Sequence, residues 1–339
     1  MPRILVVAPN WIGDALMAQP LLARLREKLP RVRLDALAPA WVAPVLRRME
    51  EVEEVIETGF EHGALELRAR WRLGSSLRER AYDQAIVLPN SWKSALVPFF
   101  ADIPLRSGYV GESRYGLLNL LYRRTNGERG PMALHYARLS EKPGAAPREP
   151  LPEPRLRVDA ARAAETARKF GFAAHPRINA VFCPGAEFGP AKRWPAPAFG
   201  ELAQALAARG AAVWLLGSAT DAGPCGEVER ASSGAAANLA GRTALDEAIE
   251  LISAADVVVT NDSGLMHVAA AVGTPQVALF GSSSPRHTPP LAANARVVWL
   301  GVECSPCFAR ECPLGHFRCM REIAAARVLE ELRVLGIVA

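Results

Sequence analysis

Short runs of apolar, often β-branched residues alternate along this chain with longer stretches in which apolar residues recur every three or four positions. The first run is Arg3–Ala8, and a helical pattern over Ala15–Lys28 follows it. Strands that alternate with amphipathic helices are typical of a parallel sheet covered by helices on both faces. The opening pattern therefore predicts a doubly wound α/β domain.

The same alternation predicts the rest of the first half. We expect strands at Arg33–Leu37, Val52–Glu57, Asp83–Leu88 and Leu105–Tyr109, and helices at Trp41–Met49, around Gly63–Arg80 and from Ser91. The stretch Glu141–Pro154 then contains five prolines, which cannot continue a helix or a central strand. We expect a connector there, with one domain over residues 1–150 and a second over 151–339.

After the connector the alternation starts again. It predicts strands at Ile178–Cys183, Ala212–Leu216, Val257–Thr260 and Gln276–Phe280, and helices at Pro197–Ala208, Ala244–Ala254, Leu265–Val272 and Glu322–Leu335. The expected architecture is α/β, with two tandem Rossmann-like domains facing a cleft. Ligands of such sheets bind beyond the carboxyl ends of the strands, so the chemistry is expected in the loops that follow the strands.

Composition narrows the class of protein. Half of the 339 residues are hydrophobic and 22% are charged, which excludes a disordered or fibrous chain. The apolar run at the N-terminus is too short for a signal peptide, and the uncharged stretch Ser263–Pro285 is interrupted by Gly273-Thr274-Pro275. We expect a cytoplasmic globular protein whose membrane contacts are peripheral.

The net charge of +5 is unevenly distributed, because residues 1–150 carry 22 basic and 17 acidic groups whereas residues 151–339 carry 18 of each. This asymmetry favours an anionic partner for the first half, although a solvated surface with uneven charge explains it equally well. A nucleic-acid-binding protein is disfavoured, since aromatic residues make up only 7% of the chain and no recognition motif is present.

The loop after the first strand, Pro9–Asp14, lacks the Gly-x-Gly-x-x-Gly pattern of dinucleotide-binding domains, which argues against an NAD oxidoreductase. Asp14 stands at the expected N-cap of the next helix, and Asp is among the best capping residues. The alternative is functional: a carboxylate at the carboxyl edge of the sheet can accept a proton from a bound hydroxyl.

Two loops of the second half have the composition of a diphosphate site. In Cys183–Trp194, the small residues Gly185 and Ala186 let backbone N–H groups approach an anion, and Lys192 supplies a positive charge. In Thr260–His267, Ser263 and the N–H groups from Gly264 onward start a helix. Asp262 is a candidate to cap that helix or to bind a ribose, and His267 lies one turn into it.

Three motifs together resemble the ADP-heptose:lipopolysaccharide heptosyltransferases. They are Asn10-Trp11-Ile12-Gly13-Asp14 with Leu16-Met17-Ala18-Gln19-Pro20, then Lys192-Arg193-Trp194-Pro195, then Asn261-Asp262-Ser263-Gly264-Leu265-Met266-His267 with Gly273-Thr274-Pro275. The resemblance implies a GT-B fold, an ADP-heptose donor in the second domain and a lipid A–Kdo inner-core acceptor over the first. The cysteine-rich tail is most similar to the subfamily that extends the first heptose.

The resemblance also implies roles for individual residues. It places the catalytic aspartate at Asp14, the phosphate-binding lysine at Lys192 and the ADP loop at Asp262, Ser263, Gly264 and His267. Members of the family often have hydroxyl residues where this chain has Gly185-Ala186, so only backbone donors remain there. Asn10, Trp11 and Gly13 are expected beside the bound substrate.

No Asp-x-Asp pair occurs, and such a pair is the usual way to hold a divalent cation against a sugar diphosphate. We therefore expect inverting transfer without a required cofactor or catalytic metal. The acceptor is polyanionic, and its candidate ligands in the first half are Lys93, Arg106, Arg114, Tyr115, His135 and Arg138. Each of them taken alone is better explained as a solvated charge, and only as a set do they match the side where an anion is expected.

The tail contains Cys304, Cys307, Cys312 and Cys319, with His316 between the last two. These ligand types suit zinc, but their spacing departs from that of paired zinc ribbons. A structural metal is possible but not favoured over packed thiols. The alternatives left open are a first or third heptosyltransferase or another nucleotide-sugar transferase, and the sequence does not determine the oligomeric state.

Overall fold

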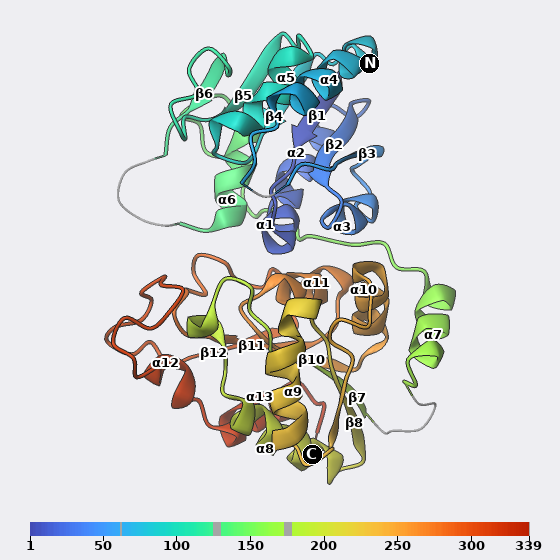
Figure 1. Cartoon of the computed structure of the whole chain (residues 1–339), viewed down its shortest axis with the longest axis vertical. Helices are drawn as coiled ribbons and strands as arrows, with labels where there is room; N and C mark the ends of the chain where they lie inside the picture. The colour runs from blue at the N-terminus through green and yellow to red at the C-terminus, as the bar shows by residue number, and fades with distance from the viewer. Residues whose placement is uncertain (62, 125–129, 173–177, 339) are drawn as a thin grey trace. The chain divides into compact units, whose positions relative to one another are not determined.

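The computed structural model describes residues 1–61, 63–124, 130–172 and 178–338. The chain divides into two compact units, Met1–Pro154 and Arg155–Ala339, and each contains its own parallel sheet. Figure 1 shows both units, each with helices packed around its strands. The predicted α/β class with two Rossmann-like halves is confirmed.

The first unit contains a six-stranded sheet in the order β3-β2-β1-β4-β5-β6, and every neighbouring pair is parallel. The strands are β1 (Arg3–Val7), β2 (Arg33–Pro39), β3 (Glu54–Thr58), β4 (Gln84–Val87), β5 (Leu105–Tyr109) and β6 (Leu120–Tyr122). The first strand lies at the centre because the chain winds outward from it in one direction and then in the other.

Short helices connect these strands. They are α1 (Ile12–Met17), α2 (Gln19–Lys28), α3 (Ala43–Arg47), α4 (Leu67–Leu77), α5 (Leu96–Phe100) and α6 (Met132–Ala137), with 3-10 turns η1 (Arg78–Arg80), η2 (Trp92–Ala95) and η3 (Arg138–Ser140). The prediction of a single helix over Ala15–Lys28 is wrong in both its start and its continuity. The structure starts it at Ile12 and breaks it at Ala18, next to Pro20, whose ring cannot lie in a helix interior.

The second unit repeats the topology, with strand order β12-β11-β10-β7-β8-β9. Its strands are β7 (Ile178–Cys183), β8 (Ala211–Leu215), β9 (Ala236–Asn238), β10 (Val257–Asn261), β11 (Gln276–Phe280) and β12 (Ala295–Trp299). The strands β10 and β11 are buried throughout, which explains their continuous apolar runs.

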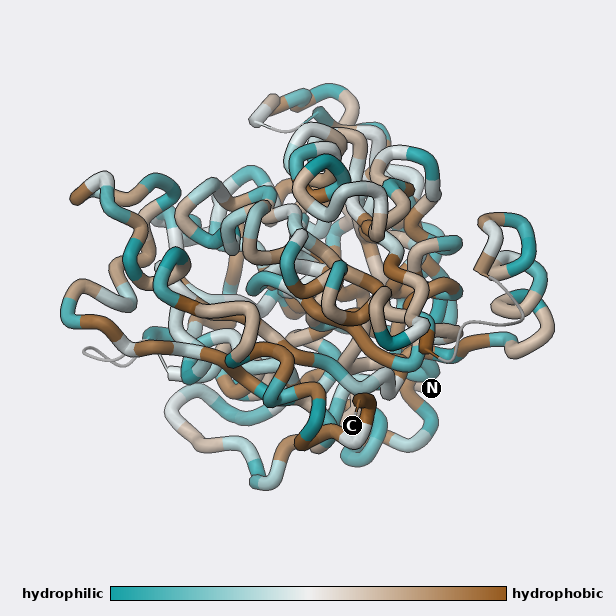
Figure 2. Tube along the Cα trace, turned by 90° about the horizontal axis from the view of Figure 1, so that it is seen from below, coloured by the Kyte–Doolittle hydropathy of each residue, from teal (hydrophilic) through white to brown (hydrophobic). Residues whose placement is uncertain are grey.

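Helices cover this second sheet as well. They are α7 (Ala160–Lys169), α8 (Ala196–Ala207), α9 (Ala222–Ala231), α10 (Leu245–Ala254), α11 (Gly264–Val272), α12 (Arg318–Arg321) and α13 (Ala325–Val334), with 3-10 turns η4 (Pro190–Lys192) and η5 (Ala219–Asp221). Teal and brown alternate along many of the helical coils in Figure 2, as expected of amphipathic helices that bury one side. Among the described residues, no helix combines the length and the apolar character that crossing a membrane requires.

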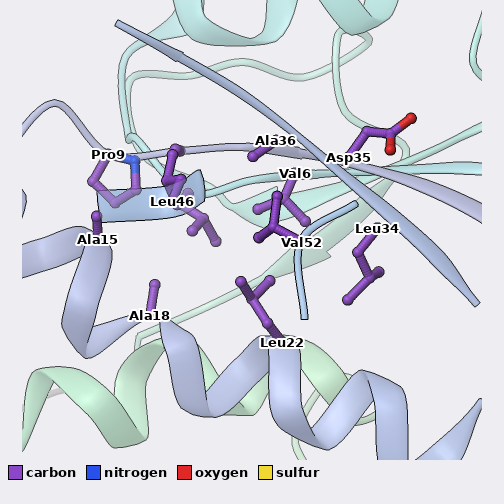
Figure 3. Close-up of a pocket in the computed structure, with 12 residues that line it drawn as sticks. Val6, Pro9, Ala15, Ala18, Leu22, Leu34, Asp35, Ala36, Leu46 and Val52 are labelled. Atoms are coloured by element: carbon purple, nitrogen blue, oxygen red, sulfur yellow. The ribbon is translucent and has the colours of Figure 1, made fainter. Parts of the chain in front are cut away.

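The first unit contains a small cavity of about 10 Å³. Figure 3 shows aliphatic side chains such as Val6, Leu22 and Leu46 around it, while the Asp35 carboxylate points away from them. That carboxylate accepts a hydrogen bond of 2.7 Å from the hydroxyl of Tyr82. The cavity is a packing void, because its lining gives a water or a polar ligand few partners.

Candidate active site

In both sheets the strand order reverses next to the first strand, between β1 and β4 in one unit and between β7 and β10 in the other. Loops that leave such a switch point diverge, and open α/β sheets bind their ligands there. The loop after β1 leads to Asp14, the loop after β7 contains Lys192, and β10 is followed by Asp262. The topology thus places each predicted residue at the carboxyl edge of its own sheet.

Asp14 lies in the first turn of α1 and is half-buried. Its predicted position as N-cap is wrong, because the helix begins earlier and Trp11 occupies the cap. The carboxylate pairs instead with Tyr136 of the distant helix α6. Burial raises the pKa of Tyr136 well above its usual value, and the charge of Asp14 and a hydrogen bond to it act in the same direction. The protonated phenol therefore donates to the Asp14 carboxylate.

Cationic and aromatic side chains gather near this pair. Burial raises the pKa of Tyr109 to about 12, while the positive charges of Arg138 and Arg124 oppose that rise. The charge of Arg124 also acts on Tyr136. The imidazole of His135 stacks on the ring of Tyr109, with centroids 3.8 Å apart. The predicted pair His135 and Arg138 thus lies beside Tyr109, whose charge in turn acts on Tyr136. Sequence reasoning missed Arg124 and Tyr136.

Arg114 requires a correction. It was predicted to contact the acceptor, but its side chain is only 1% exposed. Its guanidinium donates to the backbone carbonyls of Tyr109, at 2.7 and 3.0 Å, and of Pro89 and Ser91. Burial lowers its pKa to about 10. Because its donors already serve these carbonyls, Arg114 fixes the loops after β4 and β5, and a role as an acceptor ligand is not supported.

The other predicted acceptor ligands differ in how many of their hydrogen bonds are already made within the first unit. Arg106 donates to the carbonyls of Ile103 and Leu117 at 2.6 and 2.7 Å, so much of its hydrogen-bonding capacity is used within the unit. Lys93 is half-buried on η2, with its ammonium 3.4 Å from the carbonyl of Ala64. Tyr115 is 58% exposed.

In the second unit, Lys192 and Asp262 form an ion pair, with 2.6 Å between Nζ and Oδ2. Asp262 is buried and accepts a further hydrogen bond from the hydroxyl of Thr288 at 3.3 Å. It therefore does not cap α11; that position belongs to Ser263. The ammonium of Lys192 also lies 5.0 Å from the centre of the Phe188 ring. These contacts hold the Lys192 charge beside the start of α11.

Asn261 ties the loop after β7 to the loop after β10. Its Nδ2 donates to the carbonyl of Pro184 at 2.7 Å, and its Oδ1 accepts from the backbone N–H of Trp194 at 3.0 Å. The hydroxyl of Ser263 lies 3.4 Å from that of Thr260. Two segments far apart in the sequence are thereby fixed against each other.

His267 is buried on α11, close enough to Asp262 and Lys192 for their charges to act on it. Burial lowers its pKa to about 4; the nearby Asp262 opposes this change, and Lys192 reinforces it. The imidazole is therefore neutral near pH 7 and contributes a hydrogen-bonding group without a charge.

Gly185 is needed for packing as well as for its backbone. A Cβ at this position would lie 2.2 Å from Oδ1 of Asp221. The other oxygen of Asp221 accepts from the backbone N–H and the hydroxyl of Ser218, at 2.9 and 2.7 Å. Oδ1 is buried, and none of the described residues donates to it. Asp221 was not among the residues predicted from the sequence. Ala186, beside Gly185, is buried.

The cysteine-rich segment folds back on the lysine loop. Cys304, Cys307, Cys312 and Cys319 line one small cavity, together with Ala191 and Ser282 among others. Hydrogen bonds from backbone N–H groups, first among them that of Phe317, lower the pKa of Cys312. As they stand, no three His, Cys, Asp or Glu side chains in the described part of the chain are arranged to hold a metal ion.

Comparison with known proteins identifies the family. Residues 70–318 match the model of glycosyltransferase family 9 (heptosyltransferase). The chain is 46% identical over 344 residues to lipopolysaccharide heptosyltransferase 2 of Escherichia coli K12, covering 98% of each chain. It is 47% identical to the lipooligosaccharide heptosyltransferase 2 of Haemophilus influenzae Rd, over 88% of each.

Solved structures agree with this relationship. The structure of E. coli ADP-heptose lps heptosyltransferase II matches with a TM-score of 0.88 and 44% identity over 98% of both chains. An E. coli heptosyltransferase solved with ADP, WaaC, matches with a TM-score of 0.71, but its 20% identity supports the fold alone. The resemblance predicted from the three motifs is confirmed: the chain belongs to glycosyltransferase family 9, the heptosyltransferases.

Proposed function

We propose that the protein is the second lipopolysaccharide heptosyltransferase, which moves heptose from ADP-heptose to the first heptose of the inner core. The observation that carries this proposal is the Asp14 carboxylate at the carboxyl edge of the first sheet, where the phenol of Tyr136 orients it. The names of its relatives support the same assignment. The first unit is proposed to hold the acceptor and the second unit the donor.

Asp14 is the proposed general base. Its carboxylate takes the proton of the acceptor hydroxyl as the hydroxyl oxygen attacks the anomeric carbon of the donor. The bond from that carbon to the diphosphate breaks in the same step, so the configuration inverts and ADP leaves with the electron pair. General-base assistance of this kind typically contributes ~10²–10⁴-fold to the rate.

Negative charge develops on the departing ADP, and the second unit offers positive potential for it. Lys192, the backbone N–H groups of Gly185 and Ala186, and those from Gly264 at the start of α11 are the proposed diphosphate ligands. Ser263 and His267 contribute uncharged hydrogen-bonding groups to the same site. The proposed reaction requires no metal, because these groups supply the electrostatic stabilisation.

Asp262 is proposed to accept hydrogen bonds from sugar hydroxyls of the donor. Its carboxylate would repel a phosphate if it stood alone, but its contact with Lys192 neutralises that charge. When the diphosphate binds, the Lys192 ammonium is shared between both anions. The ion pair thus keeps the lysine in position before the donor arrives.

The acceptor is polyanionic, and the proposed ligands for it are cations and polar groups of the first unit. They comprise Lys93, Arg106, Tyr115, Arg124, His135 and Arg138, with Asn10, Trp11 and Gly13 on the loop after β1. Because a lipid acceptor lies at the cytoplasmic surface of the inner membrane, we propose that the protein works there as a peripheral enzyme.

The function is tested with two defined acceptors, one carrying no heptose and one carrying a single heptose. Each is incubated with ADP-heptose and the purified protein, and the products are identified by mass spectrometry. Extension of the one-heptose acceptor alone is expected. Extension of the heptose-free acceptor would instead assign the first transferase, and extension of neither would contradict the proposal.

The catalytic role is tested in the same assay with Asp14→Asn, which keeps the shape of the side chain and removes its basicity. Turnover is expected to fall by about 10²–10⁴-fold while the dissociation constant for ADP-heptose stays within about twofold, since the proposed donor site lies in the second unit. Ordinary turnover by this variant would refute the assignment of Asp14 as general base.

A further inference from the structure

An exposed apolar and basic surface lies on helix α4 of the first unit. The helix buries Arg70, Gly74 and Leu77, which recur at helical spacing and face the unit. Leu67 and Trp71, on the flank of that buried side, are 48% and 53% exposed. Arg68 and Arg72, also exposed, form a parallel row one position further along the chain.

The neighbouring loop extends this surface. Arg70 donates to the carbonyl of Leu65 at 2.6 Å, and its guanidinium also lies 3.4 Å from the carbonyl of Lys93. These contacts bring the start of α4 together with η2, where Trp92 is 41% exposed. Leu65, Leu67, Trp71 and Trp92, with Arg68 and Arg72, are called the α4 surface below.

The helix is held rigidly from below. A Cβ on Gly74 would lie 2.5 Å from the Cβ of Phe100, so α4 and α5 pack closely at this glycine, and Figure 1 shows the two helices side by side. The guanidinium of Arg70 stacks 4.1 Å from the centre of the Phe60 ring. Helix α4 is thus packed firmly against the unit through its buried side. The exposed apolar side chains on its flank are not accounted for by packing within the unit.

The charges of the surface favour an anionic partner. Helix α4 contains no acidic residue. Two carboxylates beside the surface accept hydrogen bonds from backbone N–H groups: Glu66 from that of Glu61 at 2.7 Å, and Glu112 from that of Trp92 at 3.2 Å. Tryptophan and leucine beside arginine form the combination that binds the interface of a bilayer containing anionic lipids.

We propose that the α4 surface docks the protein on an anionic phospholipid bilayer. Trp71 and Leu67 enter the interface, and Arg68 and Arg72 contact the headgroup phosphates. The loops after β3 and β4, which carry part of this surface, leave the same edge of the sheet as the loop that leads to Asp14. Docking there keeps that edge close to a lipid-anchored acceptor. This inference builds on the proposed function by assigning the membrane contact to particular residues.

The test measures sedimentation of the whole protein with vesicles that contain no lipopolysaccharide. One set contains phosphatidylglycerol and phosphatidylethanolamine, and the other contains phosphatidylcholine alone. Binding to the anionic set that weakens with added salt is expected. Arg68→Gln with Arg72→Gln should reduce partitioning about fivefold per removed charge, and Leu67→Ser with Trp71→Ser by about tenfold or more.

Matched controls come from exposed residues of the second unit, Val334→Ser and Arg242→Gln, which should bind like the unmodified protein. Turnover of a water-soluble, deacylated acceptor should be unchanged in all variants, whereas KM for a vesicle-bound acceptor should rise in the α4 variants alone. If the unmodified protein does not turn over the soluble acceptor, the proposed function is contradicted. The vesicle-binding result would still test the docking proposal.

Three outcomes would overturn the docking proposal. They are equal binding of the α4 variants and the unmodified protein to anionic vesicles, no binding of the unmodified protein to them, and binding only when the vesicles contain the acceptor lipid. The last outcome would assign the surface to the acceptor itself. Circular dichroism and thermal unfolding of each variant exclude loss of the fold as the cause of weaker binding.

Discussion

At the scale of single residues, the Asp14 carboxylate, the proposed general base, is held by the phenol of Tyr136. Asp14 was identifiable from its motif, but nothing in the sequence connects it with Tyr136, because the contact joins α1 to a short helix late in the unit. A buried hydroxyl that donates to a carboxylate both orients it and favours its ionised form. Tyr136 is therefore a positioning residue for the proposed base.

Tyr136→Phe removes this hydrogen bond and preserves the ring. We expect kcat to fall about 10- to 150-fold, in line with ~1.5–3 kcal/mol for a hydrogen bond to a charged group, while KM for the donor is unchanged. The acid limb of the pH–kcat profile should move to higher pH, because the carboxylate loses a donor that stabilises its charge. An unshifted acid limb would show that Tyr136 serves packing alone.

The buried His267 predicts a dependence of stability on pH. Its pKa is about 4 in the folded protein and about 6.5 when unfolded, so the unfolded chain takes up the proton first as pH falls. The contribution of His267 to the free energy of unfolding should be constant above pH 6.5. As pH falls from 6.5 to 4, the free energy of unfolding should decrease by about 1.4 kcal/mol per pH unit. In urea titrations, His267→Asn should flatten this part of the profile, and an unchanged slope would contradict the assignment.

At the scale of elements, the cysteine-rich segment supports the lysine loop. The N–H of Ala191 donates to the carbonyl of Arg310 at 3.0 Å, and a Cβ on Gly189 would lie 2.4 Å from that same oxygen. The N–H of Phe308 reaches the carbonyl of Ser282 at 2.6 Å. The segment thus packs against two loops at the carboxyl edge of the second sheet, which the spacing of its cysteines does not reveal.

The state of these cysteines remains a prediction, in which packed thiols are favoured over a structural metal. Plasma mass spectrometry of untagged protein purified without chelator is expected to find well under one equivalent of zinc or iron. Thiol titration of the unfolded protein should then count all six cysteines as reduced. One equivalent of tightly bound metal, lost together with thermal stability in Cys312→Ser, would contradict this expectation.

At the scale of the whole molecule, the excess of basic residues in the first half agrees with a polyanionic acceptor. Part of this charge lies on Arg124 and Arg138, which act on Tyr109. With a soluble acceptor, KM should fall as ionic strength is lowered, since screening weakens attraction between exposed charges. The KM for ADP-heptose should change less, because Lys192 is mostly buried. An acceptor KM that is indifferent to salt would count against these cations.

The sequence by itself determined the class of fold, because apolar periodicity reports burial on a sheet or helix directly. It located most strands of both units, including β5, β7 and β11 with their observed bounds. It missed the short elements β6, β9 and α6, since a few residues carry too little periodicity to detect. It also missed the strand β12 and the ten-residue helices α7 and α9. The motifs also led to Asp14, Lys192 and Asp262 as candidate site residues, because strand-to-helix loops have distinctive residue types; their roles stay a prediction.

Only the tertiary structure decided which of the candidate side chains are committed to partners. Arg114 and Tyr115 are adjacent and both polar, yet one is buried against backbone carbonyls and the other is exposed. The pairing of Lys192 with Asp262 follows from the adjacency of β7 and β10, which are far apart in the chain. Burial, and with it charge state, depends on such long-range packing, which local pattern does not encode.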